Sequence, residues 1–66
     1  MRVFVNGEDR NLDDGITVDD VVDAVADDRS GIAVAVNEQV VPRSAWASTE
    51  VRAADRIEVL TAAQGG

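Results

Sequence analysis

The sequence predicts an α+β fold in which one amphipathic helix packs across a mixed β-sheet. Three observations carry this prediction. An alternating segment at residues 1–5 runs into Asn6-Gly7, the strongest two-residue signal for a β-hairpin turn. Apolar residues then recur at helical spacing over residues 18–26. Two further apolar segments, residues 32–36 and 57–61, predict the remaining long strands.

The length and composition indicate one small globular domain. The 66 residues leave little room for a deep enzyme pocket beside a core, and a hydrophobic fraction of 45% argues against disorder. We assign residues 1–61 to a folded domain and residues 62–66 to a flexible C-terminal tail without a packing signal. No apolar run reaches membrane-spanning length and no signal peptide is visible, so we expect a cytoplasmic protein.

The charge and the missing residue types exclude several functions. A net charge of −7 repels phosphate backbones, so we expect no nucleic-acid binding and a basic face on any partner. Cysteine and histidine are absent, which removes a thiolate nucleophile, a disulfide and the commonest general base and metal ligand. Lysine is also absent, so no side-chain amine can accept an isopeptide bond.

Many of the acidic residues lie close together in the first half of the chain. Their spacing does not match a calcium-binding loop, and no pocket is predicted for a pair of catalytic carboxylates. We interpret them as a solvated acidic face and expect no bound metal. They are Asp13, Asp14, Asp19, Asp20, Asp23, Asp27 and Asp28.

The helix is predicted to begin at Thr17. Thr17 is a good N-cap residue, and Asp20 stands where a capping box has its acidic residue. Valine is a mediocre helix former, so burial must hold this helix. We expect it to stop at Arg29-Ser30-Gly31, with Gly31 in the left-handed cap position. The predicted buried face contains Val18, Val21, Val22, Val25 and Ala26.

The second half of the chain reads as three strands and one helical turn. Residues 32–36 suit a central strand, residues 37–39 a turn, and Val40-Val41 a short strand that Pro42 ends. Residues 44–49 resemble a helical turn capped by Ser44. Its Trp46 is expected to pack at an edge of the core.

The last strand is predicted over residues 57–61, with Ile57 and Val59 facing inward. Leu60 is out of phase with them and is expected to face solvent, where it is a candidate contact for a partner. The order of strand, strand, helix, strand, strand, helical turn and strand describes the β-grasp arrangement. In it the first and last strands lie side by side and parallel.

The chain ends in Gly65-Gly66, and this is the predicted functional site. Without a Cβ, two glycines can pass through a narrow channel and leave the Gly66 carboxylate unhindered. Ala62, Ala63 and Gln64 before them would form an extended, low-bulk leader. The alternative interpretation is an ordinary frayed terminus.

Two stretches resemble the ThiS family of sulfur carriers for thiamine biosynthesis. The first runs from Val34 to Arg43, reads VAVNEQVVPR and is followed by Trp46; the second is the terminal AQGG. Val5-Asn6-Gly7-Glu8 and the helix start at Thr17-Val18 are also similar. The diglycine alone is shared by all ubiquitin-like carriers, whereas the first stretch is more specific.

The resemblance implies a ubiquitin-like carrier that serves as a co-substrate and is not itself an enzyme. An ATP-dependent, ubiquitin-activating-like adenylyltransferase, similar to ThiF, would adenylate the Gly66 carboxylate. A sulfur donor would then displace AMP to give a thiocarboxylate. A thiazole synthase similar to ThiG would use that sulfur. ATP belongs to the activating partner, and no cofactor is expected on the carrier.

Three alternatives remain open at this point. The chain could be a carrier resembling the small subunit of molybdopterin synthase, which is usually longer and lacks the Val-Pro-Arg…Trp stretch. It could be a ubiquitin-like modifier attached to lysines of other proteins. It could also be a β-grasp interaction module in which the tail has no role.

Overall fold

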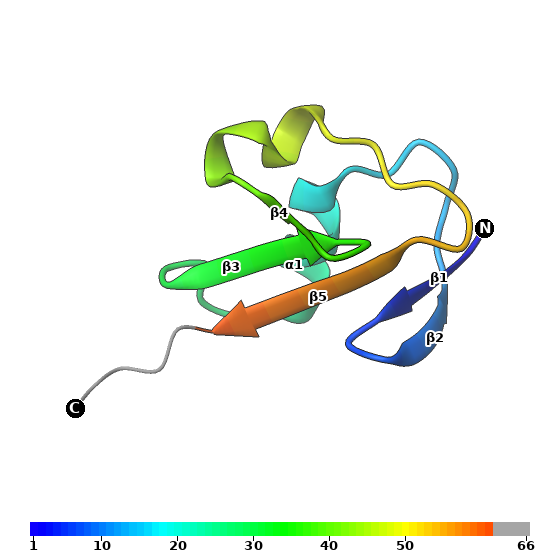
Figure 1. The fold of residues 1–66 in the computed structure, drawn as a ribbon, viewed down its shortest axis with the longest axis horizontal. Coiled ribbons are helices and arrows are strands. Elements are labelled where there is room, and N and C mark those ends of the chain that lie inside the picture. Colours follow the sequence, from blue (N-terminus) through cyan, green and yellow to red (C-terminus); the bar gives the residue numbers. More distant parts are fainter. Residues whose placement is uncertain (62–66) are drawn as a thin grey trace.

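A computed structural model describes residues 1–61, which form a five-stranded mixed sheet with one α-helix (Figure 1). The strand order is β2-β1-β5-β3-β4. β1 and β5 are parallel, and the other neighbouring pairs are antiparallel. The predicted β-grasp arrangement is therefore confirmed. The elements are β1 Arg2–Val5, β2 Glu8–Asn11, α1 Val18–Val25, β3 Ile32–Val36, β4 Gln39–Val41, the 3₁₀ helix η1 Arg43–Ser48 and β5 Arg56–Thr61.

The helix begins as predicted. The Thr17 hydroxyl accepts from the Asp20 N–H at 3.3 Å, and the Asp20 carboxylate accepts from the Thr17 N–H at 3.0 Å. This reciprocal capping box satisfies two backbone N–H groups at the helix start that have no acceptor within the helix. Val18, Val21 and Val22 are buried against the sheet, so burial compensates for their low helix propensity.

The predicted end of the helix is wrong. α1 stops at Val25, with Ala26 as an extended C-cap, and does not continue to Arg29. The Asp28 carboxylate accepts from the backbone N–H of Ser30 at 3.0 Å and from its hydroxyl at 2.7 Å. Such local side-chain bonds favour a turn over a helix, and acidic groups at a helix C-terminus oppose its dipole. Gly31 does have a positive φ, of 70°, but in the loop before β3.

The helical turn after Pro42 is a 3₁₀ helix, and its predicted cap is also wrong. Pro42 is the N-cap residue, no side chain of residues 1–61 caps the helix, and the Ala45 N–H donates to the Pro42 carbonyl at 2.8 Å. Trp46 lies in the core rather than at its edge, with 2% of its surface exposed. Its indole N–H donates to the Val41 carbonyl at 2.9 Å, which ties η1 to β4.

The core lies between α1, η1 and one face of the sheet. Inward residues of the strands alternate with exposed ones, so the other face of the sheet is open. β5 starts one residue earlier than predicted, and the β3–β4 turn is limited to two residues. The buried apolar residues are Val3, Val5, Val18, Val21, Val22, Ile32, Val34, Trp46, Val51 and Ile57.

Candidate functional site

The strand register decides which side chains share the open face of the sheet. Partners directly opposite each other in a ladder point to the same side. Phe4 on β1 is opposite Arg56 on β5, and Leu60 on β5 is opposite Ala33 on β3. The open face is therefore built around β5, the strand that leads directly to residues 62–66. Around β5 its members include Phe4, Ala33, Ala35, Val40, Arg56, Glu58 and Leu60.

Two large apolar side chains on this face are exposed to solvent. Leu60 exposes 59% of its surface, which confirms the predicted outward orientation, and Val40 exposes 77%. Sequence reasoning missed Val40. The signal was available, because Val41 must face inward for the short strand to pack, and its neighbour must then face outward. The role of Leu60 as a partner contact stays a prediction.

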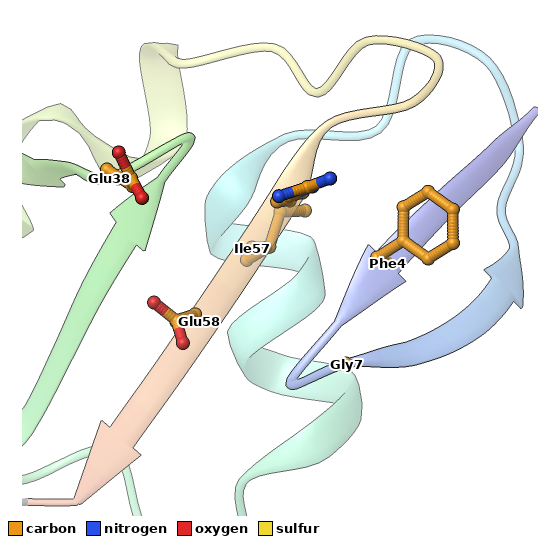
Figure 2. Close-up of a pocket in the computed structure, with 6 residues that line it drawn as sticks. Phe4, Gly7, Glu38, Ile57 and Glu58 are labelled. Atoms are coloured by element: carbon orange, nitrogen blue, oxygen red, sulfur yellow. The ribbon is translucent and has the colours of Figure 1, made fainter.

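A hollow of about 390 Å³ lies at the start of β5 (Figure 2). Its walls combine the aromatic ring of Phe4 with charged groups from β5 and from the β3–β4 turn. Glu38 lines it from the β3–β4 turn, Glu58 from β5 and Phe4 from β1. The hollow is partly open to solvent and joins the open face through Phe4, Arg56 and Glu58, so it suits contact with a surface better than enclosure of a substrate. It is lined by Phe4, Gly7, Glu38, Arg56, Ile57 and Glu58.

Two hairpin turns at this end of the sheet hold β5 in place. Asn6-Gly7 and Asn37-Glu38 all have positive φ, from 52° to 81°, as type I′ turns require. The Asn37 carboxamide oxygen accepts from the Arg56 N–H at 2.9 Å. The Asn6 carboxamide bonds both backbone groups of Val59. Sequence reasoning identified the turns but not these side-chain bonds, since they form with residues distant in the chain.

The other predicted site residues lie outside the described part of the chain. They are Ala62, Ala63, Gln64, Gly65 and Gly66. Of the predicted set, the structure therefore describes Leu60 alone. The carboxylate predicted to react belongs to a residue five positions beyond the end of β5.

Several acidic side chains in residues 1–61 hold local structure. The Arg2 guanidinium bonds Asp9 and lowers the pKa of that carboxyl. The Thr17 N–H lowers the pKa of Asp20, and the Ser30 N–H does the same for Asp28. Arg29 pairs with Asp19. Within residues 1–61 no three carboxylates form a group that could hold a metal ion, and no helix could span a bilayer.

Trp46 is flanked by two guanidinium groups. Arg43 lies 4.9 Å and Arg29 5.7 Å from the centre of the indole ring, within the range of cation–π attraction. Arg43 also donates to the Arg29 carbonyl. These contacts attach the loop after α1 to η1. Arg43 and Trp46 therefore have a structural role, and they lie on the side of the molecule away from the open face.

The mixed sheet, the single α-helix packed on one of its faces and the central last strand β5 define a ubiquitin-like β-grasp protein. A crystal structure of a thiamine biosynthesis protein, ThiS, from Geobacter metallireducens superposes with a TM-score of 0.86. That protein is 28% identical, and the match covers all of both chains. The model of the ThiS family matches residues 3–66. The chain belongs to the ThiS family.

Two curated relatives add detail. The sulfur carrier protein ThiS of Escherichia coli K12 is 30% identical over 66 residues, the whole of both chains. A thiazole synthase of Paramagnetospirillum magneticum is 32% identical, again over all 66 residues of this chain. The chain spans only 20% of the length of that synthase, which therefore contains a ThiS-like segment within a much longer protein.

Proposed function

We propose that this protein carries sulfur for the synthesis of the thiazole ring of thiamine. The observation that supports this most directly is the end-to-end match to a sulfur carrier protein ThiS, with Gly65-Gly66 at the end of the sequence. The protein acts as a co-substrate, and its reactive group is the Gly66 carboxylate.

The chemistry proceeds in two transfers on that carboxylate. A carboxylate is a poor electrophile, so an oxygen of Gly66 first attacks the α-phosphorus of ATP and pyrophosphate leaves. A hydrosulfide equivalent from the sulfur donor then attacks the acyl carbon, and AMP leaves with the bonding electrons. The product is a thiocarboxylate whose sulfur is nucleophilic. Because the chain has no cysteine, no thiol of its own can intercept the acyl adenylate.

Three partners follow from this chemistry. The first is an adenylyltransferase that binds ATP, the second is a thiazole synthase that accepts the sulfur, and the third is the sulfur donor. The thiazole synthase that contains a ThiS-like segment supports the second partner. Because activation consumes ATP, we expect the carrier to work in the cytoplasm.

We further propose that the open face docks against these partners. Leu60 and Val40 supply exposed apolar surface, and Ala62 and Ala63 continue from β5 toward the reactive end. With a net charge of −7, the carrier favours a partner surface that is basic around an apolar centre.

The intact mass of the protein tests the proposal. We expect incubation with the adenylyltransferase, ATP and a sulfur donor to exchange one oxygen for one sulfur, with the change mapped to Gly66. Deletion of Gly66 should abolish the exchange and leave the thermal midpoint unchanged. Attachment of the chain to lysines of other proteins, without any sulfur uptake, would instead identify a protein modifier. If neither product forms, the carrier function is overturned.

A further inference from the structure

β5 extends beyond the strand that pairs with it on one side. The parallel pairing with β1 covers only Phe4 with Arg56 and Val5 with Ile57. β1 then turns back at Asn6-Gly7, while β5 continues to Thr61. Figure 1 shows β5 running past the β1–β2 turn toward the C-terminal end. Among residues 1–61, no strand therefore neighbours the last residues of β5 on the β1 side.

The hydrogen bonds show which backbone groups face this gap. The carbonyls of Asp55 and Ile57 accept from β1 and the residue after it, at 2.9 and 2.8 Å. Backbone groups alternate in direction along a strand, so those of Val59 and Thr61 point the same way. The Asn6 carboxamide already bonds both backbone groups of Val59. Its oxygen accepts from the Val59 N–H at 2.8 Å, and its nitrogen donates to the Val59 carbonyl at 3.3 Å. Within residues 1–61, nothing accepts from the Thr61 N–H.

This edge lacks the protection that the other two edges of the sheet possess. Natural sheets discourage pairing at exposed edges with charges, proline or very short strands. β2 carries Glu8, Asp9 and Arg10, and β4 has three residues and is followed by Pro42. The sequence from Val59 to Ala63 contains no charge and no proline. The end of β5 is therefore the least protected edge of the sheet, and in sequence it lies next to the reactive Gly66.

We propose that an extended segment of thiazole synthase pairs with β5 at Thr61, adding a strand where β1 stops. The inference rests on the proposed function. Only five residues separate Thr61 from the end of Gly66, a reach of at most about 17 Å. A synthase that holds the Gly66 carboxylate must therefore also cover the end of β5. Backbone pairing there would fix the direction in which the tail enters the synthase.

Two substitutions at one position test the pairing. Thr61→Pro removes the N–H that faces the gap and no bond of the β3–β5 ladder, because Thr61 does not donate toward β3. The extended backbone of Leu60 also suits a residue before proline. Thr61→Ala retains the N–H and is the matched control. We expect Thr61→Pro to weaken the affinity for purified thiazole synthase about tenfold, and Thr61→Ala to leave it unchanged.

Amide hydrogen exchange on the unaltered protein provides a measurement that does not depend on a variant folding. In the free protein the Thr61 amide should exchange rapidly and the Val59 amide slowly. Saturation with thiazole synthase should slow exchange at Thr61 at least tenfold. Rapid exchange at Thr61 in the saturated complex would overturn the pairing. Equal affinities of folded Thr61→Pro and Thr61→Ala for thiazole synthase would also overturn the pairing. So would a Thr61→Pro variant that loses affinity for the adenylyltransferase alone.

Failure of the pairing and failure of the carrier function give different results. If thiocarboxylate forms and sulfur reaches thiazole synthase while Thr61 stays unprotected, the edge pairing is wrong and the carrier function stands. If no thiocarboxylate forms, the carrier function itself is wrong. Thr61→Pro should also retain sulfur uptake in the presence of the adenylyltransferase, since the pairing is assigned to the synthase.

Discussion

The side chain of Asn6 bonds Val59 as a neighbouring strand would. Its carboxamide oxygen accepts from the Val59 N–H at 2.8 Å, and its carboxamide nitrogen donates to the Val59 carbonyl at 3.3 Å. A carboxamide has the same donor and acceptor pair as a peptide group, which explains the fit. Asn6 also occupies a turn position with φ of 52°, which asparagine tolerates well. One residue therefore both turns β1 and secures β5.

We expect Asn6→Gly to lower the free energy of unfolding by about 1–2 kcal/mol, from two lost hydrogen bonds of modest net strength. Glycine keeps the positive φ, so the turn itself is retained. Asn6→Asp is the comparison, because it preserves the acceptor for the Val59 N–H and replaces the donor with a carboxylate oxygen that faces the Val59 carbonyl. Urea denaturation followed by circular dichroism measures both. Equal stability of Asn6→Gly and the parent protein would show that the carboxamide bonds contribute nothing.

Replacement of Trp46 should be among the most damaging changes in the core. Trp46→Ala removes the largest buried side chain and should cost about 3–5 kcal/mol, a large share of the 3–10 kcal/mol typical for a chain of this length. Trp46→Phe keeps most of the ring but leaves the Val41 carbonyl without its donor, at a cost of about 1–3 kcal/mol. Thermal unfolding monitored by circular dichroism should rank the variants in this order. A tolerated Trp46→Ala would contradict the burial of this residue.

The capping box should make part of the stability dependent on pH. Bonds from Thr17 hold the pKa of Asp20 below its ordinary value of 3.8, so the folded state favours the ionised form. The stabilisation of the folded state by ionised Asp20 is fully present above the ordinary pKa and is lost as pH falls through the lowered pKa. Asp20→Asn has a similar shape and does not titrate. The difference in thermal midpoint between the two proteins should be constant above about pH 5 and should change at lower pH. A pH-independent difference would exclude the coupling.

Substitution on the open face should affect binding without affecting stability. Leu60 is largely exposed, so Leu60→Ser should leave the thermal midpoint nearly unchanged. If Leu60 is a central docking contact, the same change should weaken affinity for thiazole synthase about tenfold. Ala47→Ser on η1 is the control, since Ala47 is exposed and η1 packs against the helix. Unaltered affinity of Leu60→Ser would remove Leu60 from the interface.

The features that the sequence predicted correctly depend on residues close together in the chain. The Asn6-Gly7 turn and the capping box at Thr17 are determined by two to four residues, and both are confirmed. The end of α1 was predicted wrongly, because the bonds that Ser30 donates to the Asp28 carboxylate and the contacts of Arg29 compete with the helix. The predicted cap at Ser44 failed because Pro42 starts the 3₁₀ helix.

The candidate site was predicted less completely than the fold. The outward position of Leu60 followed from its phase relative to Ile57 and Val59, and it is confirmed. The exposure of Val40 was missed, because a strand of only three residues gives little periodicity. The two bonds between the Asn6 carboxamide and the Val59 backbone could not be predicted locally, since the two residues are 53 positions apart.

The central position of β5 also has a consequence for synthesis on the ribosome. β1 and β3 do not pair with each other; each pairs with β5, which is the last strand to be translated. The nascent chain can form the two hairpins and the helix early, but the sheet cannot close until residues 56–61 leave the exit tunnel. Contacts of such long range also slow folding. The domain therefore completes its fold only after residues 56–61, which precede the tail, have been made.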